Sequence, residues 1–450
     1  MPGVHRAAWG VVVVSLDTGE RLFELQPQTL LVPASVAKVV STAGAIDTVG
    51  WQYRFETPVR VVGEVRDGVL HGDLLVVGAG DPSIGGRGGR DLGAWVDLLR
   101  GAGIQSIDGR IIGIDDAFEE PRPGFAWSWD DLGYTTGALF GALNLAENAV
   151  VVTLAPGPSP DAPATLLLSD DAMDVPIVNR VTTTAVGGHQ LVWPEMRPGE
   201  TALTITGTVP MDARPARLRV AAGNPTTWFV RALKRALLAG GVAVTGDAVD
   251  ADDLPTTTRT ALMDASVRTV FVYRSAPLTD LIKPALKMSV NLYGEALQRL
   301  NSADPGPRTN DQAVEALKTR LIGWGIPPDD VQLVDGSGLS RRDVVTADAV
   351  TSVLAHMARR DDAATWMDAL PLAGVDGTLE SRFVGTAAAR NLRAKTGTMS
   401  NIRSLAGYVR SRDGELLAFT AIANNFEGTG GQATAALDAI GVALADFSRR

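Results

Sequence analysis

Alternating and helix-spaced apolar positions follow one another in blocks along this chain and predict an α/β protein with a β-rich middle. Residues 9–16 and 21–26 are largely apolar and are separated by a short turn containing Gly19, which predicts a β-hairpin. Apolar residues then recur at helical spacing over 33–49, and we expect that helix to end at Gly50.

The pattern changes in the middle of the chain. Between residues 57 and 155, short β-like runs alternate with turns rich in Gly, Asp and Pro, and one helix is expected at 92–102. Residues 156–223 are rich in Thr, Val, Pro and Gly, which predicts a small all-β unit. Helical spacing returns from about residue 267.

The last third predicts helices first and a hairpin afterwards. Residues 278–300 form a long amphipathic pattern that we expect to break at Pro284. The end of the chain predicts a short strand at 393–398, a hairpin and then a helix at 431–447. We therefore expect the two termini to form one α/β unit, with roughly 200 β-rich residues inserted between its halves.

Composition excludes several kinds of site. The 450 residues carry 41 basic and 51 acidic side chains, a net charge of −10, which gives no electrostatic footprint for nucleic acid. There is no cysteine, so disulfides, thiolate nucleophiles and Cys-ligated metal sites are excluded. The four histidines include no His-x-x-x-His pair, and we expect neither a metal nor a cofactor.

Membrane and export signals are not evident in the sequence. No apolar run reaches the 18 or so residues that cross a bilayer, so no transmembrane segment is expected. The apolar stretch from Trp9 to Leu16 reads as a strand before a turn, and not as a signal peptide.

The first motif with chemical meaning is Ser35-Val36-Ala37-Lys38 at the start of the first predicted helix. A serine and a lysine three positions apart lie on one helical face, and a neutral lysine amine can take the proton of a serine nucleophile. Only six of the 41 basic residues are lysine. Arginine cannot lose its proton in a protein, so a lysine in this arginine-rich chain can mark a position that needs a neutral amine. The plain alternative is that Ser35 only caps the helix.

Two further motifs fit the same chemistry. Ser289 and Asn291 lie two positions apart in Lys287-Met288-Ser289-Val290-Asn291, so they can point the same way only from a turn between helices. The third motif is Lys395-Thr396-Gly397-Thr398 on a predicted strand, where Gly397 leaves room for a ligand backbone to approach. A Lys-Thr-Gly triplet is expected by chance on the order of 0.05 times in a chain this long.

Together, in this order, the three motifs resemble those of penicillin-binding proteins and class A β-lactamases. Val290 stands where the usual middle motif has Asp. About 250 residues separate Lys38 from Ser289, which resembles the low-molecular-mass class C penicillin-binding proteins, the D-alanyl-D-alanine carboxypeptidase/endopeptidase family. Further segments similar to that family are 70–74, 78–82, 108–110, 144–148 and 335–341.

This resemblance implies a fold and its domains. The fold is an α/β penicillin-binding transpeptidase-like domain, an antiparallel sheet flanked by helices plus an all-helical subdomain, with two inserted and largely β domains. The peptidase domain would comprise residues 1–62 and 263–450. An inserted domain would comprise 63–155 and 224–262, and a second, small β domain 156–223.

The resemblance also implies roles for single residues. Ser35 is the acylated nucleophile, Lys38 its general base, and Ser289 a proton relay beside Asn291. Lys395, Thr396 and Thr398, around Gly397, bind the substrate carboxylate, and the backbone N–H groups of Ser35 and Thr398 form the oxyanion hole.

A pocket for the free end of a diaminopimelate-type side chain is implied as well. Its residues would be Trp127, Asp130, Arg341 and Met399, with Thr135 at a position where the family has an aromatic residue. An Asp and an Arg suit the ammonium and the carboxylate of a zwitterionic terminus. The alternatives are that Asp130 caps a turn and that Arg341 is a surface cation.

The expected function is therefore a serine DD-peptidase that cleaves the D-Ala-D-Ala bond of peptidoglycan stem peptides and is acylated by β-lactams. The family implies an extracytoplasmic location. Two alternatives stay open, a β-lactamase and a non-catalytic wall-binding protein. No candidate deacylating Glu is evident for the first, and the complete set of motifs disfavours the second.

Overall fold

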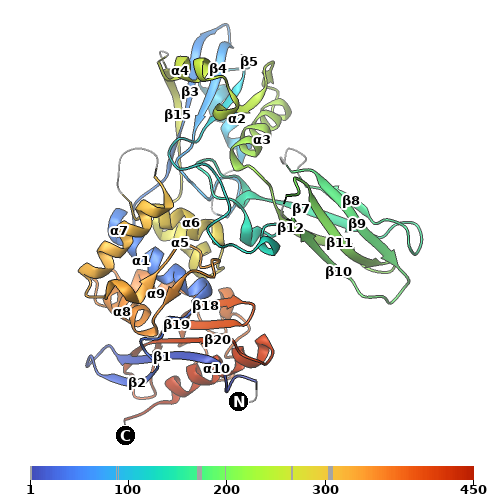
Figure 1. Cartoon of the computed structure of the whole chain (residues 1–450). Helices are drawn as coiled ribbons and strands as arrows, with labels where there is room; N and C mark the ends of the chain where they lie inside the picture. Colours follow the sequence, from blue (N-terminus) through green and yellow to red (C-terminus); the bar gives the residue numbers. More distant parts are fainter. Residues whose placement is uncertain are drawn as a thin grey trace. The chain divides into compact units, whose positions relative to one another are not determined.

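The computed structural model describes residues 3–449 with the exception of 88, 90, 170–174, 198, 265–266 and 303–307. The contacts within the chain divide it into two compact units (Figure 1). Unit 1 comprises Met1–Tyr53, Gly124–Ala126 and Pro277–Arg450, and unit 2 comprises Arg54–Pro123 and Trp127–Ala276.

Unit 1 contains one five-stranded antiparallel sheet in the order β18-β19-β20-β1-β2. It joins both ends of the chain, because Ala8–Ser15 pairs along its whole length with Leu416–Asn424. Its strands are β1 (Ala8–Ser15), β2 (Arg21–Leu25), β18 (Arg393–Met399), β19 (Ile402–Arg410) and β20 (Leu416–Asn424). The predicted terminal α/β unit and its two hairpins are confirmed.

Helices cover both faces of this sheet. Leu405, Phe419 and Ala421 pack in one apolar cluster with Leu437 of α10 (Gly430–Asp446). Thr420 points to the opposite face, where its hydroxyl accepts a hydrogen bond from Thr351 of α8 (Ala347–Ala358) at 2.9 Å.

The rest of unit 1 is a helical layer beside α8. Helix α1 contacts the three helices α5, α6 and α7. The bounds are η1 (Ala34–Val36), α1 (Ala37–Val49), α5 (Leu278–Leu286), α6 (Asn291–Arg299), α7 (Asn310–Gly323), α9 (Ala363–Ala369) and η7 (Gly377–Leu379), with the short strands β16 (Val331–Gln332) and β17 (Val344–Val345). Helix α1 ends as predicted at Gly50, which adopts φ +75°.

The predicted break at Pro284 is wrong in its position. Pro284 lies inside α5, and the chain leaves the helix only after Leu286. The backbone N–H of Val290 then donates to the Pro284 carbonyl at 3.0 Å, which closes the turn before α6. A proline near the end of a short helix removes only one N–H donor, so the helix continues past it for two residues.

Unit 2 is rich in β-structure, and its described residues form three sheets. The largest sheet has β13-β5-β4-β3-β15 as its path, with β6 on β4 and β14 on β6. Its bounds are β3 (Glu56–Arg66), β4 (Val69–Val77), β5 (Ser106–Asp108), β6 (Ile111–Ile114), β13 (Ala243–Val244), β14 (Ala248–Asp250) and β15 (Val267–Arg274). The helices of unit 2 are α2 (Leu92–Gly101), α3 (Pro225–Ala239) and α4 (Thr256–Asp264).

The other two sheets of unit 2 have three strands each, in the orders β10-β11-β9 and β12-β7-β8. Their bounds are β7 (Ala149–Ala155), β8 (Thr165–Leu168), β9 (Ile177–Thr184), β10 (Leu191–Glu195), β11 (Leu203–Pro210) and β12 (Ala216–Ala221). These strands account for the Thr- and Val-rich segment, so its predicted β character is confirmed. The boundaries proposed for the three domains stay a prediction.

Within the described part of the chain, no helix is both long enough and apolar enough to cross a membrane.

Candidate active site

Ser35 and Lys38 lie at the junction of η1 and α1. Ser35 makes no capping bond, and Val36 takes the N-cap position of α1, so the plain capping alternative does not hold. Lys38 is fully buried, and its Nζ donates to the Ser35 Oγ at 2.9 Å. Ser35 itself is half-buried.

Burial governs the protonation of this lysine. It lowers the pKa of Lys38 to about 8, although Asp335, Glu295 and Asp343 oppose that shift with their negative charge. An amine with that pKa is neutral in roughly a tenth of molecules at pH 7, whereas an ordinary lysine is almost never neutral there. The site therefore holds an amine that can accept a proton beside a serine hydroxyl.

Ser289 and Asn291 occupy the turn between α5 and α6, as the sequence predicts. Asn291 is the first residue of α6, and its Oδ1 accepts from the Lys38 Nζ at 2.8 Å. Ser289 adopts φ +60°, a conformation that costs a non-glycine residue about 1–3 kcal/mol. Lys287 holds the turn from the other side by an ion pair with Asp376 at 2.5 Å.

The third motif lies on β18, the edge strand of the sheet. Lys395 is fully buried, and its Nζ donates to the Ser289 Oγ at 2.9 Å and to the Thr396 carbonyl at 2.8 Å. Burial, together with the nearby charge of Lys38, holds the pKa of Lys395 well below its usual range. Thr398 is exposed at the end of the strand. Three segments far apart in the sequence thus form two lysine–serine pairs.

The structure gives a reason for glycine at position 397 that the sequence did not reveal. We expected its missing side chain to make room for a ligand. A Cβ at this position would instead meet the Ser404 Oγ, and would lie 2.5 Å from the carbonyl oxygen of Pro33. The glycine is therefore needed for the close approach of β18 to the turn that carries Ser35.

Sequence reasoning missed a backbone group in the site. The carbonyl oxygen of Ser337 accepts from the Lys38 Nζ at 2.6 Å, across 299 positions of the chain. Ser337 lies in the segment 335–341, whose similarity to the family was the only available signal. Thr378 of η7 was missed as well, and it accepts a hydrogen bond from the Thr396 hydroxyl at 2.8 Å.

The four residues predicted for a side-chain pocket are divided between the two units. Asp130 is exposed in a short 3₁₀ turn of unit 2, and Trp127 of the same unit is half-buried. Arg341 is exposed and Met399 half-buried in unit 1. Their shared pocket stays a prediction. Burial raises the pKa of Tyr134, next to the expected aromatic position, and the negative charge of Asp130 adds to this shift.

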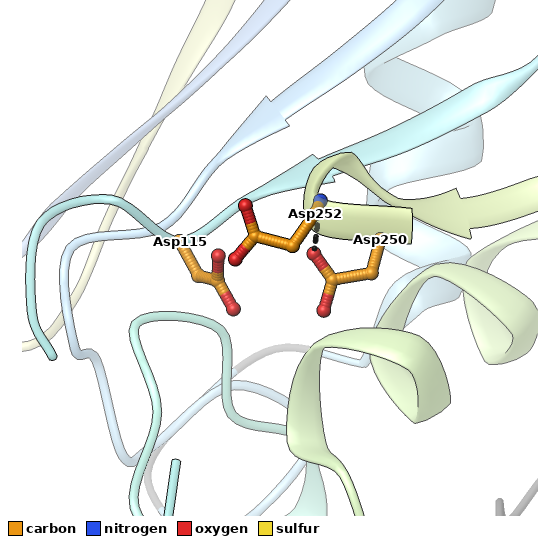
Figure 2. Close-up of side chains that lie close together, drawn as sticks. All are labelled: Asp115, Asp250 and Asp252. Atoms are coloured by element: carbon orange, nitrogen blue, oxygen red, sulfur yellow. Dashed lines mark hydrogen bonds between the residues drawn. The ribbon is translucent and has the colours of Figure 1, made fainter. Parts of the chain in front are cut away.

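Unit 2 also contains an acidic cluster that the sequence did not indicate. Carboxylate oxygens of Asp115, Asp250 and Asp252 all lie within 4.8 Å of one another (Figure 2). Arg259 forms ion pairs with Asp252 and Asp116, and burial raises the pKa of Asp250 to about 7. Arg259 thus offsets part of the negative charge of the cluster, and the expectation that no metal is bound stays untested.

The similarity to known proteins agrees with this geometry. A family model described as the D-Ala-D-Ala carboxypeptidase 3 (S13) family matches residues 2–446. The chain belongs to this family. As an S13 member it belongs to a family of peptidases, which confirms the family and the class of enzyme expected from the three motifs.

Relatives of this S13 chain carry matching names. It is 31% identical to a D-alanyl-D-alanine carboxypeptidase from Actinomadura sp. (strain R39), over 99% of this chain and 83% of that protein. It is 25% identical to the D-alanyl-D-alanine carboxypeptidase DacB of Haemophilus influenzae, over 93% of this chain and 85% of that protein.

Solved structures confirm the fold. The crystal structure of penicillin-binding protein 4 (dacB) from H. influenzae superposes with a TM-score of 0.83 at 25% identity, over 95% of this chain and 92% of that one. A structure of the same protein in complex with a β-lactam gives a TM-score of 0.78 at 23% identity, over 98% and 96%. The expected penicillin-binding architecture with inserted β domains is thus confirmed.

The close packing at Gly397 can be tested with Gly397→Ala. The added Cβ should force β18 away from Pro33 and lower the free energy of unfolding by about 1–3 kcal/mol. Gly323→Ala at the end of α7 is the matched control, because its Cβ would meet nothing within 4 Å. Equal thermal stability of the two variants would contradict the packing argument.

Proposed function

We propose that this chain is a serine DD-peptidase that hydrolyses the D-Ala-D-Ala bond of peptidoglycan stem peptides through an acyl-enzyme on Ser35. The observation that carries the proposal is the contact between the buried Lys38 amine and the Ser35 hydroxyl at 2.9 Å. A nucleophile–base pair of this kind is typical of acyl transfer. A protein that only binds its ligand needs no such pair.

The contacts of Lys38 support its role as the general base. When protonated, its three N–H groups can donate to Ser35 Oγ, Asn291 Oδ1 and Ser337 O. Once one proton has left, the two carbonyl oxygens still accept the two remaining N–H groups. The lone pair of the neutral amine is then directed at the Ser35 hydroxyl, whose proton it can take during attack.

The reaction would run in two stages. Ser35 Oγ attacks the carbonyl carbon between the two D-alanines while its proton passes to Lys38, and the oxyanion accepts from the N–H groups of Ser35 and Thr398. Ser289 would relay the proton held by Lys38 to the leaving amine, and its hydroxyl oxygen accepts a hydrogen bond from Lys395 at 2.9 Å. The C–N bond breaks, D-Ala leaves, and water hydrolyses the ester to release the shortened peptide and free Ser35.

Recognition of the substrate carboxylate is assigned to the β18 edge. Lys395, Thr396 and Thr398 supply donors there, and Gly397 keeps the strand close to Ser35. A β-lactam has the same elements, an acyl carbonyl and a carboxylate, so we propose it as a covalent inhibitor. The β-lactam complex of the H. influenzae protein is consistent with this. Because peptidoglycan lies outside the cytoplasm, we propose that the enzyme also acts outside the cytoplasm.

The nucleophile can be identified by mass spectrometry after incubation with benzylpenicillin. We expect the chain to gain the whole mass of the drug, because ring opening releases no fragment, and we expect the adduct on the peptide containing Ser35. Ser35→Ala should abolish both the adduct and D-Ala release, with unchanged thermal unfolding as the control for folding.

The other outcomes of this experiment separate the alternatives. An adduct on another serine would contradict the assignment of Ser35. An adduct lost within seconds would indicate a β-lactamase, and a lasting adduct without hydrolysis of any stem peptide would indicate a wall-binding protein.

We also propose that Asp130 binds the free ammonium of a diaminopimelate-type side chain. Acetylation of that ammonium should lower kcat/KM by roughly 10- to 150-fold, which corresponds to a lost charge-assisted hydrogen bond of about 1.5–3 kcal/mol. Asp130→Ala should remove most of the difference between the two peptides, because no carboxylate is then left unmatched. Equal turnover of both peptides by the unsubstituted chain would refute this role and leave Ser35 and Lys38 unaffected.

A further inference from the structure

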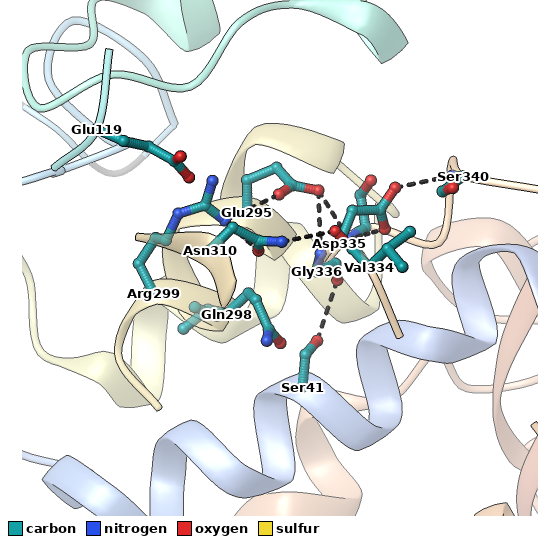
Figure 3. Close-up of polar contacts among 12 residues, drawn as sticks. Ser41, Glu119, Glu295, Gln298, Arg299, Asn310, Val334, Asp335, Gly336 and Ser340 are labelled. Atoms are coloured by element: carbon teal, nitrogen blue, oxygen red, sulfur yellow. Dashed lines mark hydrogen bonds and ion pairs between the residues drawn. The ribbon is translucent and has the colours of Figure 1, made fainter. Parts of the chain in front are cut away.

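Two residues of α6 act on Lys38, one by direct contact and the other through a backbone loop. Asn291 contacts the Lys38 amine directly, at 2.8 Å. Glu295, one helical turn further, accepts at Oε1 from the backbone N–H groups of Gly336 at 3.2 Å and Ser337 at 3.0 Å. Figure 3 shows the Glu295 carboxylate directed at this backbone segment. Ser337 is the residue whose carbonyl oxygen accepts from Lys38.

The segment itself is built for close contact. Asp335 accepts from the N–H groups of Ser337 at 3.0 Å, Gly338 at 2.6 Å and Ser340 at 2.7 Å, which folds the segment into a tight loop. Gly294 lets α6 approach this loop, since a Cβ there would lie 2.9 Å from the Gly336 carbonyl oxygen and 3.1 Å from Lys38 Cε.

We propose that Glu295 is a positioning residue for the proposed DD-peptidase reaction: its carboxylate fixes the 335–338 loop so that the Ser337 carbonyl, together with Asn291, directs the Lys38 amine at Ser35. Nothing in the three motifs assigns this role. It rests on the proposed function of Lys38 as the base. The position of the amine matters because neutral Lys38 can accept the Ser35 proton only if both of its own N–H groups are held by other acceptors, which leaves its lone pair facing the Ser35 hydroxyl.

Glu295 affects the same amine through its charge. Burial and the neighbouring Asp335 raise the pKa of Glu295 to about 7, while Arg299 opposes the shift. The charged groups that act on this pair are Asp335, Asp343, Arg299 and Lys395. Ionised Glu295 stabilises the protonated Lys38, so loss of that negative charge must lower the pKa of Lys38.

The sign of the pH effect follows from this. Acylation requires neutral Lys38, so its rate rises with pH through the pKa of this lysine. In the unsubstituted chain, Glu295 ionises first and makes Lys38 hold its proton to higher pH, which broadens the rise. Without the charge at position 295, the rise should come at lower pH and follow a single titration.

The test compares Glu295→Gln with Glu295→Ala. The amide of glutamine can still accept from the loop, so we expect the acylation rate by benzylpenicillin at high pH to fall less than tenfold, with its midpoint shifted to lower pH by about half a unit or more. Alanine offers no acceptor, so we expect the acylation rate at high pH to fall tenfold or more in Glu295→Ala. Thermal unfolding of both variants reports on folding.

Ser41→Ala is the matched control. The Ser41 hydroxyl donates to the Gly336 carbonyl oxygen at 3.0 Å, so its removal loosens the same loop without changing any charge. The midpoint of acylation should stay where it is in this variant. An unshifted midpoint in Glu295→Gln, an equal shift in Ser41→Ala, or a rate at high pH in Glu295→Ala no lower than in Glu295→Gln would overturn the proposal.

A second readout separates this proposal from the proposed function. Nuclear magnetic resonance of the chain with ¹³C-labelled lysine resolves few signals, because there are only six lysines. The Lys38 signal, assigned by its loss in Lys38→Arg, should titrate at lower pH in Glu295→Gln. If Ser35 is never acylated but this shift occurs, the proposed function fails and the control of Lys38 by Glu295 holds. No shift would refute the role of Glu295 whether or not acylation occurs.

Discussion

The burial of the Lys38 amine is the constraint on which the rest of the site depends. A buried ammonium is costly, and the free energy that opposes its charge is what brings the pKa of this lysine to about 8. The surrounding carboxylates keep this shift moderate, so that both protonation states are accessible near neutral pH. A fully apolar surrounding would give a neutral amine with nothing to orient it.

The backbone around the buried lysines is locally strained and closely packed. Ser289 stands in a left-handed conformation so that its hydroxyl and the Asn291 amide both point into the site. Gly294 and Gly397 allow α6 and β18 to approach the chain more closely than any side chain would permit. The long pairing of β1 with β20, which joins both ends of the chain, is a stable base that can offset such strain.

Much of this could be predicted from the sequence where the signal is local. The hairpin of β19 and β20, the helix ending at Gly50 and the turn required between Ser289 and Asn291 all follow from spacing and turn residues. The Ser35–Lys38 pair likewise follows from its spacing, whereas the pair of Lys395 with Ser289 was not predicted. The chain continues past Pro284 because tertiary packing of α5 outweighs one missing donor, and propensity alone does not reveal that.

The contacts that tune the site have no local signal. The Ser337 carbonyl is a backbone group 299 positions from Lys38, and any residue type would carry it. Glu295 looks like an ordinary helical acid until the loop at Gly336 is seen against it. Gly397 was correctly singled out, but its reason lies in Pro33 and Ser404, which only the folded chain brings near.

The central claim, that a buried amine at position 38 takes the proton of Ser35, is tested most directly by acylation rates measured across pH. With benzylpenicillin, the unsubstituted chain should show a rise with its midpoint near pH 8, as the pKa of Lys38 requires. Lys38→Arg keeps the charge and removes the base, so it should react at least about 10² times more slowly and show no such rise. An arginine variant that acylates at nearly the unsubstituted rate, with intact thermal unfolding, would contradict the account.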